Sequence, residues 1–382
     1  MIKRLSISAS IILVLLCITG CDDSESGTGV ENNPATATRV YGQGGSFTSG
    51  TANNGGISAD SLSRPGCVVA DSDGVYVADI NNHRVLYFEG SSTTATRVYG
   101  QGGSFTSGTD NNGGISADSL YLNTEMSPSV AVDSGGVYIA DTTNHRVLYY
   151  SGTSTTATRV YGQGNSFTSG TANNGGISAD SLYYPSGVAV DSGGVYIVDC
   201  CNCRVLYYAG TSTTATRVYG QGGSFTTNTG NNGGVSASSL YYPRSIAVGS
   251  GGIYVADMSN MRVLYFEGTS TTATRVYGQG GSFTTNTGNN GGISADSLRC
   301  PTGVAVDSDG VYIADHHNSR LLFYSGTSTT ATLVYGQGGN FTTDTANNGG
   351  ISAGSLYYPG SVAVYSGRVY VADTDNNRVL FY

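Results

Sequence analysis

The chain has 382 residues and a formal charge of −9, and charged residues make up only 11% of it. Lys3 is its only lysine, so the sequence lacks the basic surface that binds nucleic acid or anionic lipid. Its 57 glycines, with many Ser, Thr, Asn and Tyr residues, are typical of short strands joined by tight turns, and we expect an all-β fold.

The N-terminal segment has the order of an export signal. A basic start precedes the apolar run 5–18, which is too short for a stable membrane-spanning helix. Residues 18–21, Ile-Thr-Gly-Cys, resemble the lipobox of bacterial lipoproteins. We therefore expect residues 1–20 to be a signal peptide, Cys21 to carry the lipid, and residues 21–36 to form a flexible tether. The alternative is an ordinary secretion signal with an accidental cysteine.

The resemblance implies a location in the cell envelope, on the exported side, either periplasmic or at the cell surface. Contact with the membrane would then be made through the lipid alone. Besides the lipidated Cys21, five cysteines remain in the mature chain, an odd number that leaves their pairing open: Cys67, Cys200, Cys201, Cys203 and Cys300.

An internal repeat organises the rest of the chain. The sequence Tyr-Gly-Gln recurs six times, at Tyr41, Tyr99, Tyr161, Tyr219, Tyr277 and Tyr335. The spacing is 58 residues, except for one of 62 that carries an insertion around 122–127. Each copy continues through a Gly/Asn-rich connector and a Ser-Ala-x-Ser-Leu turn to a proline.

Four strands are predicted in each repeat. In the third repeat they cover 187–191, 195–199, 204–208 and 215–219, separated by Gly-rich or polar turns. Four antiparallel strands every 58 residues, with no helical period, are the signature of the blades of a β-propeller.

The two ends of the repeat region complement each other. The region opens with a lone fourth strand at 37–41 and stops after a third strand at 378–382. We predict that the N-terminal strand joins the last blade. Residues 37–382 then form one six-bladed propeller of four-stranded antiparallel blades without a seam.

The repeated motif resembles the NHL repeat. It reads Pro-x-Gly-Val-Ala-Val-Asp and then Val-Tyr-x-Ala-Asp-x-x-Asn-x-Arg-Val-Leu, and 82–84 and 144–146 read Asn-His-Arg. The resemblance implies a propeller used mostly as a binding surface for RNA, protein or extracellular ligands. One enzyme branch of the family, the peptidyl-hydroxyglycine amidating lyases, uses a zinc ion held by His.

The Asp-x-x-Asn-x-Arg element occurs in all six repeats. It could form a ring of charge around a ligand, but six copies favour a structural turn in which Asp and Asn bond the turn's amides and Arg pairs with Asp. The aspartates are Asp79, Asp141, Asp199, Asp257, Asp315 and Asp373. The arginines are Arg84, Arg146, Arg204, Arg262, Arg320 and Arg378.

Candidates for catalysis are scarce, and we assign no catalytic or cofactor-binding residue. An active site needs unlike groups that converge, whereas this chain offers sixfold copies. The four His residues fall in turns of different repeats, so they should not meet at one metal ion: His83, His145, His316 and His317. Cys200, Cys201 and Cys203 could hold a soft metal, form a disulfide or stay as inert thiols.

The repeats differ mainly at two clusters, the variable positions of Asp-x-x-Asn-x-Arg and the residues before the proline. Strands alternate in direction, so both clusters should share one face with the long connectors, while the opposite face should show only short turns. Tyr and Arg are favoured contact residues in binding patches, although drift at tolerant exposed positions would give the same pattern. The candidates on this face are Arg64, Glu125, Tyr183, Tyr184, Tyr241, Tyr242, Arg299, Tyr357 and Tyr358.

These observations favour a non-catalytic, membrane-anchored binding or scaffold propeller that presents one loop-rich face to a protein or glycan partner. We expect a monomer without a cofactor and without affinity for nucleic acid. The alternatives are a propeller-type lyase or lactone hydrolase with a metal in the central channel, and a structural envelope protein.

Overall fold

The computed structural model describes residues 36–123, 126 and 128–382. The described residues all belong to one compact unit. The predicted signal peptide, Cys21 and nearly all of the predicted tether lie outside them. No helix among the described residues is long and apolar enough to cross a membrane.

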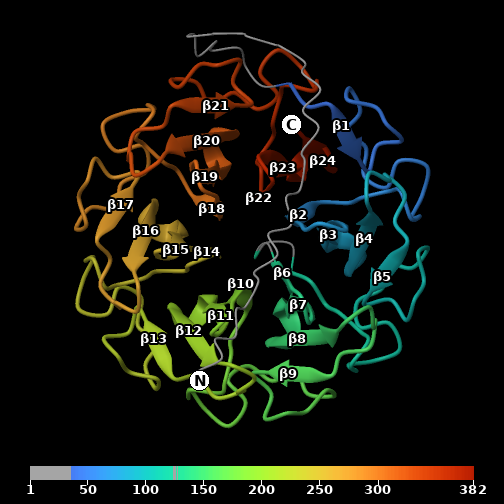
Figure 1. Cartoon of the computed structure of the whole chain (residues 1–382), viewed down its shortest axis with the longest axis horizontal. Helices are drawn as coiled ribbons and strands as arrows, with labels where there is room; N and C mark the ends of the chain where they lie inside the picture. The colour runs from blue at the N-terminus through green and yellow to red at the C-terminus, as the bar shows by residue number, and fades with distance from the viewer. Residues whose placement is uncertain (1–35, 124–125, 127) are drawn as a thin grey trace, which may run out of the picture. The chain divides into compact units, whose positions relative to one another are not determined.

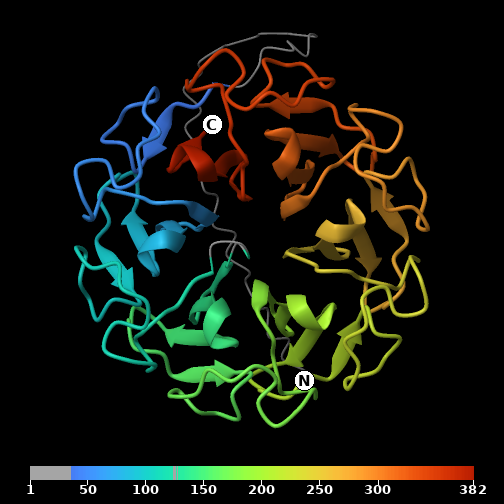
Figure 2. The ribbon, with the colours of Figure 1, turned by 180° about the vertical axis from the view of Figure 1, so that it is seen from behind.

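Six four-stranded antiparallel sheets are arranged in a ring (Figures 1 and 2). Blade 1 contains β2 (Pro65–Ala70), β3 (Gly74–Asp79), β4 (Arg84–Glu89) and β5 (Arg97–Tyr99). Blade 2 contains β6 (Val130–Asp133), β7 (Gly136–Asp141), β8 (Arg146–Ser151) and β9 (Arg159–Tyr161). Blade 3 contains β10 (Pro185–Asp191), β11 (Gly194–Asp199), β12 (Arg204–Ala209) and β13 (Arg217–Tyr219).

The second half of the ring repeats this order. Blade 4 contains β14 (Ser245–Gly249), β15 (Gly252–Asp257), β16 (Arg262–Glu267) and β17 (Arg275–Tyr277). Blade 5 contains β18 (Pro301–Val306), β19 (Gly310–Asp315), β20 (Arg320–Ser325) and β21 (Leu333–Tyr335). Blade 6 contains β22 (Ser361–Tyr365), β23 (Arg368–Asp373), β24 (Arg378–Phe381) and, from the other end of the chain, β1 (Arg39–Tyr41).

Both faces of each blade are buried, which explains the continuous apolar strands of the sequence. In β11, Val195 and Ile197 pack against blade 2, whereas Tyr196 and Val198 pack against blade 4. Successive side chains of a strand point to opposite faces, so one strand contributes to two cores. The hydrophobic core is therefore divided into six clusters between neighbouring blades.

The predicted closure is confirmed. Strand β1 pairs with β24 in the register Arg39 to Phe381, Val40 to Leu380 and Tyr41 to Val379. The outer strands are shorter than predicted. In blade 3 the strand begins at Arg217 rather than at Ala215, because the Ala215 amide donates to Ala179 O of the preceding connector, 2.9 Å away.

The repeated ion pair is completely buried and reaches beyond its own turn. In blade 3, Asp199 Oδ2 accepts from Arg204 Nε at 2.7 Å and from Asn202 Nδ2 at 2.7 Å. Its Oδ1 accepts from the Tyr183 amide at 2.7 Å, in the connector rather than in the turn itself. The Arg204 guanidinium donates further to Ser178 O at 2.9 Å and Phe225 O at 2.6 Å. Each pair thus ties the connector before a blade to the connector after it.

The Tyr-Gly-Gln motif, at the end of the outer strand, forms hydrogen bonds to the turn between the second and third strands. In blade 3, the side chain of Gln221 donates to Cys203 O at 3.0 Å and to Thr229 O at 2.9 Å. Gly220 has φ +98°, and a Cβ atom there would lie 2.7 Å from Cys203 O. Only glycine fits this approach without strain.

The central channel is apolar. It is a cavity of about 210 Å³ lined by Val, Ala and Ile side chains of the innermost strands β2, β6, β10, β14, β18 and β22. Within the described residues, no ionisable side chain lines it. The channel wall therefore offers no general acid or base.

Strand β1 should be required for full stability. A chain that begins at Gly42 should lose about 3–5 kcal/mol of unfolding free energy relative to one that begins at Thr36, because the buried Val40 and Tyr41 side chains no longer pack. Chemical denaturation of the two purified proteins measures the difference. Equal midpoints would contradict the role given to the closure.

Candidate binding face

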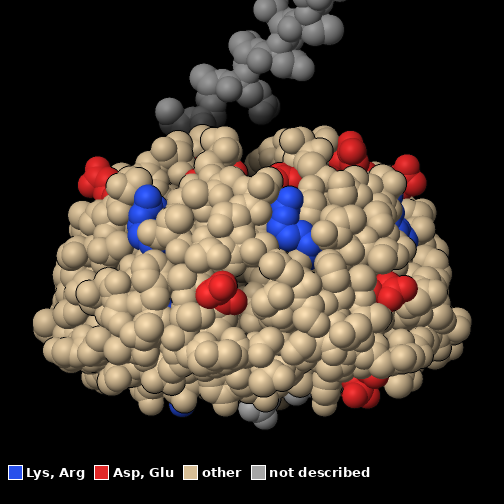
Figure 3. Space-filling view, turned by 90° about the horizontal axis from the view of Figure 1, so that it is seen from below, with Lys and Arg blue, Asp and Glu red and all other residues tan. Residues whose placement is uncertain are grey.

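The two variable clusters of the sequence lie beside each other on one face of the ring. In blade 3, the turn amide of Cys201 donates to Tyr183 O, the residue two before the proline, at 3.1 Å. We call this side, with its strand-two-to-three turns and long connectors, the connector face. The other side, with the hairpins between strands one and two and between strands three and four, is the hairpin face. Seen edge-on, charged side chains are sparse on the visible surface (Figure 3).

The predicted tyrosine pairs differ in exposure. Tyr241 and Tyr242 are exposed, at 38% and 36%, and their rings pack 4.9 Å apart. The pairs of blades 3 and 6 are half-buried. Tyr184 packs on His145 with ring centroids 4.5 Å apart, and Tyr358 stacks on His316 at 5.0 Å. The three candidate pairs on this face are therefore not equivalent, and only the pair of blade 4 is exposed.

The residue on the preceding blade explains this difference. His145 and His316 supply rings against which the next blade's tyrosines pack, whereas the position equivalent to His145 beside Tyr242 is the smaller Cys203. Tyr241 packs on Gly230 and on the Tyr242 ring, and both tyrosines remain more than one third exposed.

Charged candidates flank these aromatic pairs. The Arg64 guanidinium lies 3.4 Å from the carboxylate of Asp375 on the neighbouring turn, and Arg299 is exposed. Burial raises the pKa of Asp375, and the charge of Arg64 opposes this shift. Glu125 lies outside the described residues.

Several variable turn residues accept a hydrogen bond across the blade boundary. The amides of Tyr184 and Arg64 donate to His145 Nδ1 at 3.2 Å and Asn377 Oδ1 at 2.8 Å, respectively. Tyr184 and Arg64 have φ of +51° and +52°, which turns each amide toward the previous blade. His145 must be neutral to accept this bond, and burial lowers its pKa to about 4.

The cysteine turn does not assemble a three-ligand site. Cys200 and Cys203 are buried and Cys201 is half-buried, and the Cys200 thiol lies 3.9 Å from Met126 Sδ. Among the described residues, no group of three His, Cys, Asp or Glu side chains is placed to hold a metal ion. The predicted set of Cys200, Cys201 and Cys203 is therefore not brought together as ligands.

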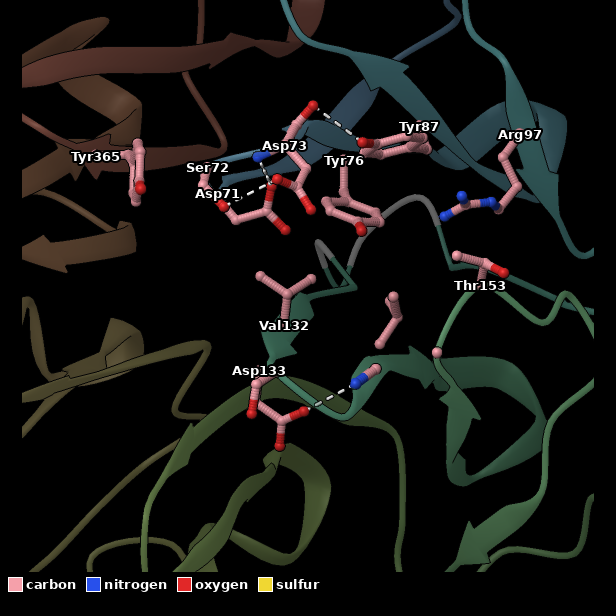
Figure 4. Close-up of a pocket in the computed structure, with 14 residues that line it drawn as sticks. Asp71, Ser72, Asp73, Tyr76, Tyr87, Arg97, Val132, Asp133, Thr153 and Tyr365 are labelled. Atoms are coloured by element: carbon pink, nitrogen blue, oxygen red, sulfur yellow. Dashed lines mark hydrogen bonds between the residues drawn. The ribbon is translucent and has the colours of Figure 1, made fainter.

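The hairpin face holds a groove that the sequence analysis missed. It lies between blades 1 and 2, has a volume of about 510 Å³, and is lined by Asp71, Tyr76, Arg97 and Asp133 among others (Figure 4). One signal was available in the sequence. The position at the end of the inner strand differs among the repeats. It is Asp in repeats 1, 2, 3 and 5, Gly249 in repeat 4 and Tyr365 in repeat 6.

Replacement of His145 by Asn should reduce the acid sensitivity of the fold. The pKa of His145 is about 4 in the folded chain and about 6.5 when exposed, so its contribution to stability is complete above pH 6.5 and falls as the pH drops toward 4. Asn accepts the same bond, as Asn377 does, but does not titrate. Between pH 7 and 4.5 the variant should lose about 2 kcal/mol less stability than the parent in urea titrations. Identical pH profiles would contradict this assignment.

Comparison with known proteins agrees with the architecture. The NHL repeat model matches residues 182–208, 298–322 and 356–381, which span the first three strands of blades 3, 5 and 6. No curated protein matches the sequence significantly.

Three solved structures illustrate the likeness of fold. A streptogramin B lyase structure is 11% identical, with 84% of this chain and 83% of that chain covered and a TM-score of 0.46. The virginiamycin B lyase of Staphylococcus aureus is 12% identical, with 90% and 87% covered and a TM-score of 0.46. The glutaminyl cyclase of Myxococcus xanthus is 8% identical, with 90% and 94% covered and a TM-score of 0.41. These similarities carry no information on function. The chain thus contains NHL repeats, and its described residues form a six-bladed β-propeller.

Proposed function

We propose that the protein is a membrane-anchored, non-catalytic binding propeller that presents its connector face to a partner protein. The observation that carries this proposal is the exposed pair Tyr241 and Tyr242 on that face. Among the described residues, only one other large hydrophobic side chain, Tyr365, is exposed, and it lies on the hairpin face.

The chemistry of the patch suits a protein interface. Two packed Tyr rings offer rigid apolar area together with hydroxyl groups, and the exposed Arg299, before the proline of the next blade, adds a guanidinium to the same face. The apolar channel supports binding over catalysis, because its wall carries no group that could transfer a proton.

Removal of the tyrosine pair should abolish partner capture without unfolding the propeller. A double change of Tyr241→Ser and Tyr242→Asn suits the site, because Asn tolerates the φ of +47° at position 242. With a photo-reactive amino acid at position 299, cross-linking in envelope fractions should fall at least about tenfold in this variant.

The matched control is Tyr365→Ser, which removes an equally exposed ring from the opposite face. Cross-linking that falls equally in both variants, or in neither, would contradict the proposal. If the cross-linked partner resists protease but is degraded by glycosidase, the partner is a glycan and not a protein.

The membrane anchor is a separate part of this proposal and rests on the lipobox-like sequence before Cys21. Cys21→Ser should move the protein from the membrane fraction to the soluble fraction or block its processing. Cys17→Ser, four residues earlier in the same segment, should leave membrane retention unchanged. Retention of the Cys21→Ser protein on membranes, measured by fractionation and immunoblotting, would refute the lipid anchor.

A further inference from the structure

The groove on the hairpin face has opposite charges at its two ends. Asp133 ends the inner strand of blade 2, Asp71 directly follows the inner strand of blade 1, and Asp73 lies in the hairpin after it. Arg97 comes from the outermost strand of blade 1, and its guanidinium lies over the Tyr87 ring, 4.6 Å from the centroid. Figure 4 shows the Arg97 side chain extending into the groove from the side opposite Tyr365. The inner end is therefore anionic and the outer end cationic.

Tyr76 supplies an unused polar group between these ends. Its side chain is only 7% exposed, and its hydroxyl, which points into the groove in Figure 4, makes no hydrogen bond to any described residue. The equivalent hydroxyls of Tyr138 and Tyr196 donate to Asp133 and Asp191, both at 3.3 Å. A hydroxyl that faces the groove without a protein partner is free to bond a ligand or water there.

Asp71 also keeps acceptor capacity for a ligand, whereas both oxygens of Asp133 already accept hydrogen bonds from its own blade. Asp71 Oδ1 accepts the amides of Asp73 and Gly74 at 2.9 Å each, which fixes the carboxylate in the hairpin. Asp71 Oδ2 makes no hydrogen bond within the described part of the chain. An immobilised carboxylate with one open oxygen is well suited to accept from an ammonium group.

We propose that this groove binds a short peptide with free termini. Its ammonium group lies against Asp71 and Asp133, its carboxylate pairs with Arg97, and the Tyr76 hydroxyl donates to a peptide carbonyl between them. A diamine would place one of its charges against Arg97, and a dicarboxylate would place one against the aspartates, so the groove selects a ligand of opposed charges.

The radial spacing of the strands sets the length of the peptide. The Arg97 guanidinium lies over the third strand, two strand spacings from the inner strand that Asp71 follows, which corresponds to about 10 Å. An extended peptide covers about 3.5 Å per residue, so two or three residues fill the interval. The groove's volume of about 510 Å³ accommodates such a ligand.

Calorimetric titration of the purified propeller with trialanine tests the proposal. Trialanine should bind, and N-acetylation or C-terminal amidation should each weaken binding at least about tenfold, because each removes one of the two charged contacts. No heat of binding with trialanine, or equal affinity for the blocked peptides, would overturn it.

The other blades provide natural replacements for the variants. Asp133→Gly copies Gly249, Arg97→Leu copies Leu333, and Tyr76→Phe removes only the hydroxyl. The first two should weaken trialanine binding at least about tenfold, and the third about fivefold. Thermal melting confirms that each variant remains folded.

A second groove offers matched controls. It lies between blades 3 and 4, has a volume of about 310 Å³ and contains Tyr196 and Arg217, but Gly249 replaces its second carboxylate. Tyr196→Phe and Arg217→Leu should leave trialanine binding unchanged. Loss of binding in these controls, or its persistence in folded Asp133→Gly and Arg97→Leu proteins, would refute the assignment. The change of Tyr241 and Tyr242 on the connector face should have no effect, which separates this site from the proposed partner surface.

Discussion

The propeller depends on one buried ion pair per blade. Asp199 and Arg204 are fully buried, and burial alone would make each charge costly. The cost is offset because Asp199 accepts three hydrogen bonds, while the guanidinium reaches carbonyls of the connectors on both sides of the blade. These connectors contain no regular strand, and the arginine gives them a common anchor. Removal of the aspartate would leave the arginine as a buried, unpaired charge, and both connectors that the guanidinium contacts would be affected.

This constant framework allows the two faces to vary independently. On the connector face, one side chain of the preceding blade decides whether the next tyrosine pair is packed or exposed, as His145 and Cys203 illustrate. On the hairpin face, the inner-strand aspartate decides how much charge a groove carries, as the comparison of Asp133 with Gly249 shows. Neither change alters the buried pairs or the strand pairing, since Gly249 pairs with Gly252 as Asp133 pairs with Gly136, so binding properties can change without altering the fold.

The fold could be predicted from the sequence because the same pattern of strands and turns recurs in every repeat. Six copies of one pattern predicted the blades, and the lone strand at the start predicted the pairing of Val40 with Leu380 that the structure contains. Side-chain environments were harder to predict, because they depend on contacts between neighbouring repeats. Tyr184 and Tyr242 have the same place in their repeats but different neighbours, and only the structure brings those neighbours together. The groove beside Tyr76 was missed for the same reason, since two blades build it.

The pairing of β1 with β24 also constrains the order of folding. Strand β1 is synthesised before the blades, yet its partner is the last strand described, so the two must meet across more than 300 intervening residues. Until then the third strand of blade 6 has an open edge that can pair with another chain. Blades 1 to 5 have no such requirement, since each is assembled from consecutive strands. The slow, error-prone step should therefore be the final docking of the chain's beginning onto its end, and conditions that delay it should favour aggregation through strand exchange between molecules.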